Sequence, residues 1–463
     1  MSRYTCILVS GEAPPVFSII PLYTLSFHWS LGAILAKADE VLKLAMSILR
    51  SRKYRNFSLS APEESGVEWS TLDWFSDAPD VESKEVNETG LHKVPVLGGV
   101  PATRIIGVDG SSRRFSTPYG AFVIATVAVT LGHSLFIDYP PLEYEYPVRW
   151  ELKAPFMATY ASEDIEKHTY DLIATKSPAG YPYLPPRSSS TSGSTSGGYA
   201  LADMAHEVRT KLETLGLRAA ASIGHARSLI LLDGPLYQRP WRLEVRRSRY
   251  LKEDWKRLTE ERVNALREAY NRGIAVIGSV KRLDKSRLIV KAHGTLIKAL
   301  RLSSPFPPQE NDHAEAVQLA RAYVAQHSLR GLDPLLIGPL HIVPPAKLQD
   351  KIGVKMPEIV YSYVVIPMLP YNGNLDRTPC RVIRLEVLSE VYEKEGLGVF
   401  FRVLSEGFTG NPLLPRAQVI ADARCKHTCK RLFEQMCRYA LVEGVELSYS
   451  TWMAFHVGES YAE

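Results

Sequence analysis

The first part of the chain changes from a helical pattern to a polar one. Apolar residues between Leu31 and Arg50 recur every three or four positions, which predicts a helix with one buried face. Residues 57–95 are polar, acidic and interrupted by proline, and they predict a linker or a surface excursion. We therefore expect an N-terminal helical extension and linker over residues 1–95, a main domain over residues 96–445 and a C-terminal tail over residues 446–463.

The main domain alternates between short apolar runs, which predict strands, and longer amphipathic stretches, which predict helices. The predicted strands cover residues 104–109, 121–130, 134–137, 228–233, 274–280, 358–368, 382–387 and 399–404. The predicted helices cover residues 202–217, 253–272 and 417–442. Because strand, helix and strand follow one another, we expect parallel pairing and an α/β fold. The serine- and glycine-rich residues 186–199 predict a flexible loop.

The composition is that of a soluble globular protein. Of the 463 residues, 45% are hydrophobic and 23% are charged, so the chain is not disordered and can bury a large core. The formal net charge of +5 permits a polyanionic partner without requiring one. The five cysteines are an odd number in a long chain, which argues against a secreted disulfide framework and favours a reducing cytoplasm.

One uncharged segment, from Ala13 to Ala36, is long enough to cross a bilayer. Prolines, a histidine and several hydroxyl residues interrupt it, and the chain lacks the basic start and cleavage site of a signal peptide. We therefore expect no membrane association. The sequence also lacks a phosphate-binding loop ending in Gly-Lys-Ser or Gly-Lys-Thr, so we do not expect nucleotide hydrolysis by this chain alone.

Two segments share one design, an apolar run followed by an aspartate and a glycine: Ile105 to Gly110 and Leu229 to Gly234. A buried strand holds such a carboxylate rigidly at a sheet edge, and the glycine lets the chain turn. Side by side, Asp109 and Asp233 would repel one another unless a divalent cation lay between them. The alternative for each Asp-Gly pair is an ordinary turn or helix cap.

Many enzymes that cleave phosphodiesters use divalent ions held by paired carboxylates. One ion activates the attacking water, and another stabilises the leaving oxygen. The two aspartates therefore suggest a phosphoryl-transfer nuclease.

The sequence resembles the NurA nuclease family over about residues 100–440. The matching pieces occur in the order of the family, and they are Val108-Asp109-Gly110-Ser111, Arg209-x-x-Leu212-Glu213, Leu232-Asp233-Gly234-Pro235-Leu236, Val276-Ile277-Gly278-Ser279-Val280-Lys281-Arg282 and Val382-Ile383-Arg384-Leu385-Glu386-Val387. The resemblance implies a ribonuclease-H-like mixed sheet flanked by helices, and a Mn²⁺- or Mg²⁺-dependent deoxyribonuclease with 5'-3' exonuclease and single-strand endonuclease activity. It also implies a homodimer in the archaeal cytoplasm that joins the hexameric HerA helicase in double-strand break resection, homologous recombination and DNA repair.

On the matching positions, the resemblance makes Asp109, Glu213 and Asp233 the metal-binding carboxylates. Glu213 lies on a predicted helix, where Glu207 is an alternative and where a glutamate is often a solvated charge. Lys281 and Arg282 follow a predicted strand and would hold a substrate phosphate, or they are a solvated surface pair. Glu386 would be a supporting carboxylate or the partner in an ion pair.

The chain departs from the family near its C-terminus. The family has a Gly-Tyr-Pro stretch followed by Ala-His, whereas this chain has Asn411 and Gln418 at the corresponding positions. Glutamine offers an oxygen to a metal or a hydrogen bond to a phosphate, but it does not titrate near neutral pH as histidine does. We count Gln418 among the catalytic candidates. The alternative hypothesis is that the chain is a catalytically weakened scaffold subunit that binds DNA or the helicase.

Two further clusters have a functional and a structural interpretation. Cys425, His427, Cys429 and Cys437 form an acceptable zinc ligand set, but their spacing follows one helix and favours packed structural cysteines. An arginine cluster interleaved with aromatic residues follows Asp233 and suits single-stranded nucleic acid, although a solvated face has the same composition. It contains Arg239, Arg242, Arg246, Arg247 and Arg249 with Tyr237, Trp241 and Tyr250.

Overall fold

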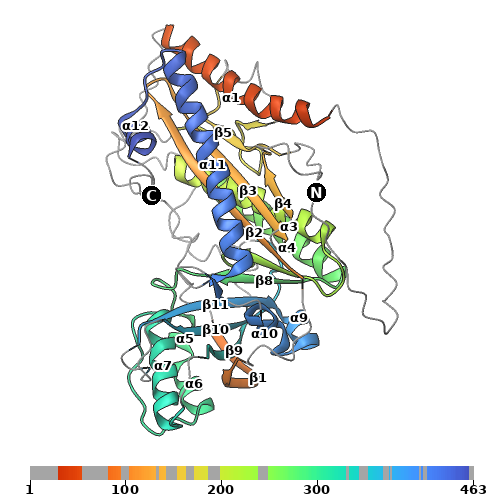
Figure 1. Ribbon diagram of the computed structural model, residues 1–463, viewed down its shortest axis with the longest axis vertical. Coiled ribbons are helices and arrows are strands. Elements are labelled where there is room, and N and C mark those ends of the chain that lie inside the picture. The colour runs from red at the N-terminus through yellow and green to blue at the C-terminus, as the bar shows by residue number, and fades with distance from the viewer. Residues whose placement is uncertain are drawn as a thin grey trace, which may run out of the picture.

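The structure, a computed structural model, describes most of the chain (Figure 1). The described residues are 30–54, 82–94, 104–131, 135–141, 154–162, 172–185, 199–237, 249–329, 333–343, 353–368, 375, 378–405, 408–409 and 414–457. The predicted serine- and glycine-rich loop lies outside them, apart from its last residue.

Eleven strands form one mixed sheet. They are β1 (Glu82–Lys93), β2 (Ile105–Thr117), β3 (Gly120–Leu131), β4 (Leu135–Tyr139), β5 (Met157–Thr159), β6 (Ile173–Ala174), β7 (Leu229–Asp233), β8 (Ala275–Val280), β9 (Leu335–Val343), β10 (Ile359–Pro367) and β11 (Cys380–Leu388). Their order is β1-β9-β10-β11-β8-β7-β2-β3-β5-β6, and β4 also pairs with β3. A separate pair consists of β12 (Phe408–Thr409) and β13 (Leu414–Pro415).

The helices that surround the sheet are α1 (Ser30–Tyr54), α3 (Leu201–Ile223), α4 (Arg249–Asn271), α5 (Leu288–Lys291), α6 (His293–Ala299), α7 (Asp312–Gln326), α9 (Ser389–Glu395), α10 (Gly398–Ser405), α11 (Arg416–Val442) and α12 (Tyr449–His456). The prediction of a mixed α/β fold with a sheet flanked by helices is confirmed. Its finer form, a ribonuclease-H-like sheet, stays a prediction. The predicted strand–helix–strand segment is β7, α4 and β8, whose strands pair in parallel as expected.

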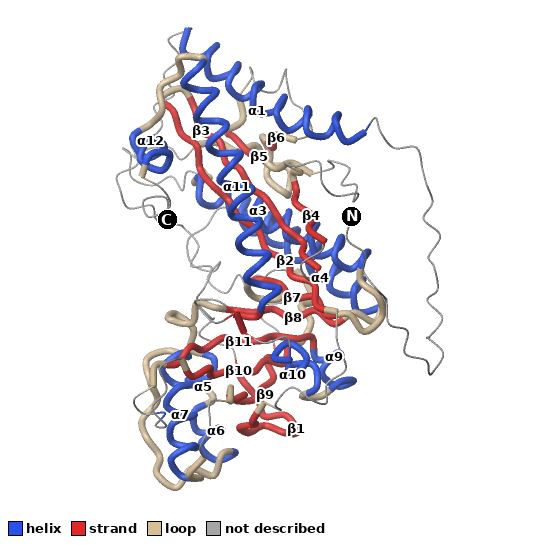
Figure 2. Tube along the Cα trace, viewed as in Figure 1, coloured by secondary structure: helices blue, strands red, loops and turns tan. Residues whose placement is uncertain are grey.

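Alternating residues of the central strands contact helices on opposite faces of the sheet. Val108 of β2 lies against Gly216 of α3, whereas Gly107 lies against Ala417 of α11. Figure 2 shows α11 running lengthwise over β2 and β3, and α1 packs against α11 on that side. The period of two along β2 therefore decides which side chains meet α3 and which meet α11.

The other half of the molecule continues the same sheet through β11, β10 and β9. Helices α5, α6 and α7 lie on one side of these strands, and α9 and α10 lie at their other end (Figure 1). A buried polar network ties this half together: Asp312 of α7 accepts hydrogen bonds from the backbone of Leu288 and Ile289 at 3.1 and 2.9 Å. Such pairing is needed because an ionised carboxylate with no exposed surface is costly unless it is hydrogen-bonded.

Two of the elements differ from the sequence-based expectations. Residues 82–93, which we expected in a linker, form β1 at the edge of the sheet and pair antiparallel with β9. The charged composition that suggested a linker is also what an edge strand needs to resist pairing with other chains. Residues 399–404, predicted as a strand, lie in α10, where Val399, Phe400, Val403 and Leu404 are buried at helical spacing. Short apolar runs of this length fit either element.

The C-terminal segment is anchored to the sheet. The backbone of Ser116 in β2 donates to the hydroxyl of Thr451 in α12 at 2.8 Å, and the backbone of Ser448 donates to the Ser116 carbonyl at 3.0 Å. Within residues 446–457, the expected tail is therefore a packed element. Among the described residues, no helix has the length and hydropathy to cross a membrane.

Candidate metal centre

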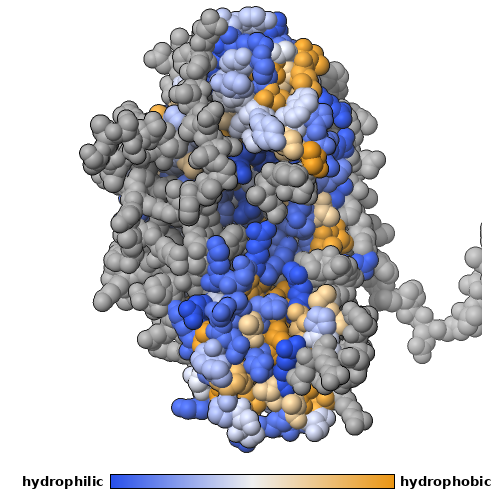
Figure 3. Space-filling model, turned by 90° about the vertical axis from the view of Figure 1, so that its left-hand side faces the viewer, coloured by the Kyte–Doolittle hydropathy of each residue, from blue (hydrophilic) through white to orange (hydrophobic). Residues whose placement is uncertain are grey.

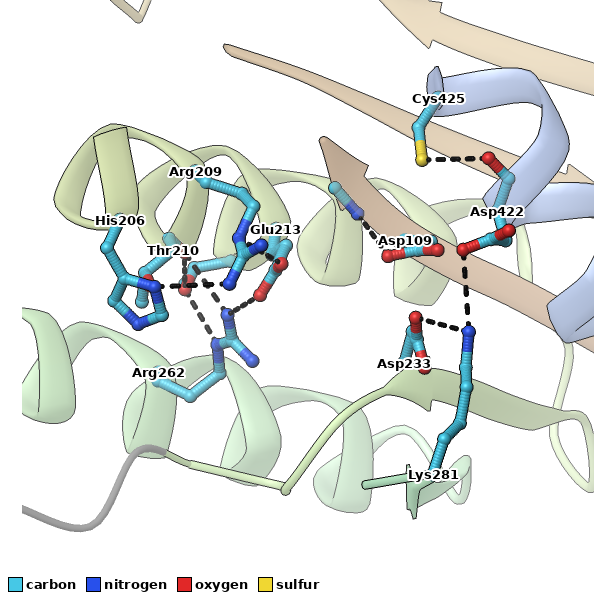
Figure 4. A network of polar contacts seen from close by, with 12 residues as sticks. Asp109, His206, Arg209, Thr210, Glu213, Asp233, Arg262, Lys281, Asp422 and Cys425 are labelled. Atoms are coloured by element: carbon cyan, nitrogen blue, oxygen red, sulfur yellow. Dashed lines mark hydrogen bonds and ion pairs between the residues drawn. The ribbon is translucent and has the colours of Figure 1, made fainter. Parts of the chain in front are cut away.

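Three aspartates from distant parts of the sequence converge at one point (Figure 4). Asp109 comes from β2, Asp233 ends β7, and Asp422 lies on the second turn of α11. One oxygen of each carboxylate lies within 4.8 Å of one oxygen of the other two. Parallel pairing of β2 with β7 brings the first two together, and the passage of α11 over these strands adds the third.

The approach of α11 depends on a glycine in β2. A Cβ atom at Gly107 would lie 2.3 Å from the carbonyl oxygen of Ala417, much closer than real Cβ atoms come. Asp109 stands two residues further along the strand, and its side chain therefore points to the same face as Gly107, toward α11. The sequence predicted that Asp109 ends its strand. This is wrong, because β2 continues to Thr117 and Asp109 lies in its interior.

Asp233 does end its strand, and the next residue makes the turn. Gly234 has a φ of 96°, a conformation that side chains other than glycine adopt at a cost. The turn is fixed by the buried Glu386, which accepts a hydrogen bond from the backbone of Leu236 at 3.2 Å. Glu386 also accepts a hydrogen bond from Arg384 at 2.9 Å. Glu386 lies in β11 and forms the predicted ion pair, with Arg384. Its alternative role as a supporting carboxylate stays a prediction.

Burial and like charge act together on the carboxylates. Burial raises the pKa of Asp109 well above its ordinary value, and the neighbouring Asp233 carboxylate raises it further, although Lys281 opposes this. Burial also raises the pKa of Asp422, but the ammonium groups of Lys281 and Lys426 outweigh it and leave that pKa below its ordinary value. Crowded carboxylates of this kind are a suitable ligand set for a hard divalent cation, which relieves their repulsion.

Lys281 follows β8 and contacts two of the three aspartates. Its Nζ lies 2.8 Å from Asp233 Oδ2 and 3.4 Å from Asp422 Oδ1. Burial lowers the pKa of Lys281, but the Asp233 and Asp109 carboxylates raise it above the ordinary value, so the ammonium stays charged. Arg282, its predicted companion, has an exposed side chain.

Gln418 lies one helical turn before Asp422 and touches the same centre. Its side-chain amide donates a hydrogen bond to Asp233 Oδ1 at 2.5 Å, and its carbonyl oxygen accepts one from Ser279 Oγ at 2.8 Å. The residue at the predicted histidine position is therefore buried beside Asp233. Asn411 lies outside the described residues.

Glu213 lies on α3 and approaches β2 next to Asp109. Its side chain packs against Gly110, whose added Cβ would lie 2.7 Å from Glu213 Cγ, and Gly110 faces the side of the sheet opposite to Asp109. The Glu213 carboxylate accepts a hydrogen bond from the buried Arg262 at 3.1 Å, and Arg209 lies 3.5 Å away. Its role as a metal ligand stays a prediction.

The alternative glutamate, Glu207, has other partners. It is buried and accepts a hydrogen bond from Tyr183 at 2.8 Å, and burial together with the charge of Asp254 raises its pKa well above the ordinary value. Glu207 thus belongs to a separate buried network between α3 and α4.

Sequence reasoning missed Asp422. The available signal was its spacing of four residues from Gln418 on a predicted helix, because residues so spaced share one face. The same helix carries Cys425, Cys429 and Cys437, which are buried free thiols, whereas His427 is exposed. Within the described part of the chain, the residues grouped closely enough to hold an ion are the three aspartates and not the cysteines.

The arginine cluster after Asp233 lies almost wholly outside the described residues, including Arg239, Arg246 and Arg247. Tyr237, its first aromatic member, is buried and donates a hydrogen bond to the Pro357 carbonyl at 2.7 Å, so it is not free to stack on a base. On the side of the molecule drawn in Figure 3, hydrophilic side chains gather at mid-height, where the surface is hollowed.

Comparisons with known proteins agree with the resemblance noted in the sequence. A family model described as the NurA domain matches residues 103–395, which is more than half of the chain. No curated protein matches it. Among solved structures, the NurA nuclease from Sulfolobus solfataricus is similar at 12% identity and a TM-score of 0.40, covering 77% of this chain and 88% of that one. A NurA bound to dAMP and manganese has 13% identity and a TM-score of 0.30, covering 74% and 89%.

Proposed function

Because the chain belongs to the NurA family, we propose that it is a metal-dependent deoxyribonuclease whose cation is bound by Asp109, Asp233 and Asp422. The observation that carries the proposal is the convergence of these three carboxylates, with oxygens within 4.8 Å of one another, on the face of the sheet that α11 covers. The donor set is made of hard oxygens only, which fits Mg²⁺ or Mn²⁺.

A divalent cation bound there would supply an activated water and neutralise charge on the scissile phosphate. The remaining work falls to side chains of this chain. Gln418 fixes the orientation of the Asp233 carboxylate through its amide, and Ser279 fixes the amide in turn. The Lys281 ammonium lies among the carboxylates, where it favours the approach of an anionic phosphate to an otherwise negative centre.

DNA is the proposed substrate, since the resemblance to NurA nucleases implies it and the net charge of +5 permits a polyanionic partner. Lys281 and Arg282 would contact the phosphate nearest the cation. Arg239, Arg246 and Arg247 directly follow the Asp233 turn in sequence, and we propose that they guide a DNA strand toward the centre.

The finer assignments follow from family membership alone. We propose 5'-3' exonuclease and single-strand endonuclease activity, a homodimer, and action beside a HerA-type hexameric helicase in double-strand break resection in the cytoplasm of an archaeon. Glu213 remains a candidate ligand within this proposal, provided that its pairing with Arg262 is broken when metal binds.

A scaffold function is the second candidate, and one observation favours it. Gln418 occupies the position where the family has histidine, and glutamine cannot exchange a proton near neutral pH. A subunit with this change would keep its surfaces for DNA and helicase while losing turnover.

Cleavage of end-labelled linear DNA separates the two candidates. Single- and double-stranded substrates are incubated with Mn²⁺, Mg²⁺ or EDTA and with native protein, Asp109→Asn or Asp233→Asn; manganese is tested first because it accompanies NurA in two solved structures. Asp284→Asn is the matched control, because Asp284 is exposed and lies outside the three-aspartate group.

The nuclease predicts metal-dependent cutting that both aspartate variants lose and that the Asp284 variant keeps. An absence of cutting with either ion, with a HerA-type helicase present, combined with retained DNA or helicase binding, would establish the scaffold instead.

A further inference from the structure

Both oxygens of the Asp233 carboxylate already accept a hydrogen bond from the protein. Oδ1 accepts the Gln418 amide at 2.5 Å, and Oδ2 accepts the Lys281 ammonium at 2.8 Å. A carboxylate oxygen has two lone-pair sites, so Asp233 keeps one site on each oxygen. Two-metal nucleases place their ions about 3.5–4 Å apart and share carboxylates between them. Here the N–H donors of Gln418 and Lys281 lie where Asp233 would bind a second ion.

The Lys281 ammonium lies between two of the three carboxylates, as Figure 4 shows. Its contacts with Asp233 and Asp422 are of the kind that a second cation would make in the same place. The side chain is well enclosed, with 18% of its surface exposed, so water screens its charge only partly.

Charge balance favours one divalent ion in this arrangement. Three aspartates carry three negative charges, Lys281 supplies one positive charge, and a single divalent ion supplies the remaining two. A second divalent ion would leave this partly buried centre with two positive charges in excess, which is unfavourable where water screens charge only in part.

Other charged groups near the centre do not change this balance. Lys426 lies 3.2 Å from Asp422 Oδ2, but 51% of its side chain is exposed, so water screens its charge. On the other face of the sheet, Glu213 carries its charge against Arg262 and Arg209.

We propose that the centre binds one divalent cation per chain and that Lys281 provides the second positive charge, in the place where a two-metal nuclease has its second ion. This inference rests on the proposed function, because it presupposes that the three aspartates hold a metal. It makes Lys281 a residue that sets the number of ions as well as a contact for the substrate phosphate.

The experiment is a titration with Mn²⁺ followed by electron paramagnetic resonance of the free ion, with native mass spectrometry of the same samples. The variants are Lys281→Met, Lys281→Arg and Lys426→Met, and Asp109→Asn identifies ions bound at this centre. Lys426→Met is the matched control, since it removes a lysine that also contacts Asp422 but lies in water.

We expect one ion per chain in the native protein, lost in Asp109→Asn. Lys281→Met is expected to bind two ions, whereas Lys281→Arg and Lys426→Met bind one. Two Asp109-dependent ions in the native protein would overturn the inference and leave the proposed function standing, and this holds even if Lys281→Met does not fold. One ion in a folded Lys281→Met would overturn the role given to Lys281. No ion in the native protein would remove the proposed function itself.

Discussion

Gln418 is held at both ends of its amide, with its nitrogen donating to Asp233 at 2.5 Å and its oxygen accepting from Ser279 at 2.8 Å. The two contacts fix which end of the amide faces the carboxylate, because a flipped amide would set two oxygens against each other. A neutral donor that cannot change its protonation state thus occupies the position that the resemblance to the NurA family assigns to a histidine.

The pH dependence of cleavage reports on this position. Imidazole gains a proton near pH 6.5, whereas an amide does not titrate there. We expect Gln418→His to add an inflection between about pH 6 and 7.5 to the rate of DNA cleavage, beyond those of the native protein. The measurement is the initial rate at fixed Mn²⁺ over pH 5.5–8.5, and superimposable profiles of the two proteins would contradict the placement of residue 418.

Removing the charge of Asp109 is expected to stabilise the metal-free protein. Its pKa is raised in the folded state by burial and by Asp233, so the folded form keeps a proton that the unfolded chain loses near pH 4. Stability therefore falls as the pH rises from about 4 to the folded pKa, by about 1.4 kcal/mol for each pH unit in that interval. In EDTA at pH 8, Asp109→Asn should unfold at a higher temperature than the native protein, and the difference should shrink toward pH 4.

The same comparison with Mn²⁺ provides the control. The native protein should gain thermal stability from the ion, and Asp109→Asn should not. If the native protein were already more stable than Asp109→Asn in EDTA at pH 8, burial and the Asp233 charge would not destabilise the ionised Asp109.

Asp422 and Glu213 are distinguished by metal affinity and stability. Asp422→Asn should weaken Mn²⁺ binding at least about tenfold, which corresponds to about 1.4 kcal/mol. Glu213→Gln should leave the affinity nearly unchanged and lower the free energy of unfolding instead, because Arg262 is 2% exposed and loses its charged partner. Calorimetric titration and urea unfolding measure the two effects, and the reverse assignment would make Glu213 the third ligand.

Gly107 controls the distance between β2 and α11. Gly107→Ala would place a methyl group 2.3 Å from the Ala417 carbonyl oxygen, so the first turn of α11 must move and take Gln418 and Asp422 with it. We expect a loss of about 1–3 kcal/mol of stability together with weaker Mn²⁺ binding. Gly294→Ala in α6 is the control, because no atom lies within 4 Å of the added Cβ, and a helical alanine gains stability over glycine. If the two variants had the same free energy of unfolding and the same Mn²⁺ affinity, this explanation of Gly107 would be wrong.

Glu386 supports the turn after Asp233 from a fully buried position. Glu386→Ala leaves the Arg384 guanidinium and the Leu236 amide without this acceptor, which should lower the free energy of unfolding by about 3–5 kcal/mol. Glu390→Ala, at an exposed position of α9, should change it by less than about 0.5 kcal/mol. Urea unfolding of both variants checks the difference, and a small effect at Glu386 would mean that water reaches the turn.

Strands buried on both faces could be predicted from the sequence because their side chains are apolar without interruption. β3, β7 and β8 are examples, and their predicted bounds lie within one or two residues of those observed. β1 could not be found in this way, since an edge strand with charged side chains has no apolar period. The residues of α10 fitted a strand as well as a helix, and only packing decides between them.

Two of the three aspartates of the centre, Asp109 and Asp233, could be predicted because each follows an apolar run and precedes a glycine. Asp422 could not be assigned with the same ease, since an aspartate on a helix is usually a solvated charge and nothing local marks it. Its partners, Asp233 and Lys281, are distant in sequence, and only the passage of α11 over β2 brings them together.

The centre is assembled from β2 near the beginning of the described chain and α11 near its end. Until the ribosome has released α11, a growing chain holds Asp109 and Asp233 without the helix that completes the group. A chain without α11 therefore lacks Asp422 and Gln418, and under the proposed function it is expected to leave DNA uncut.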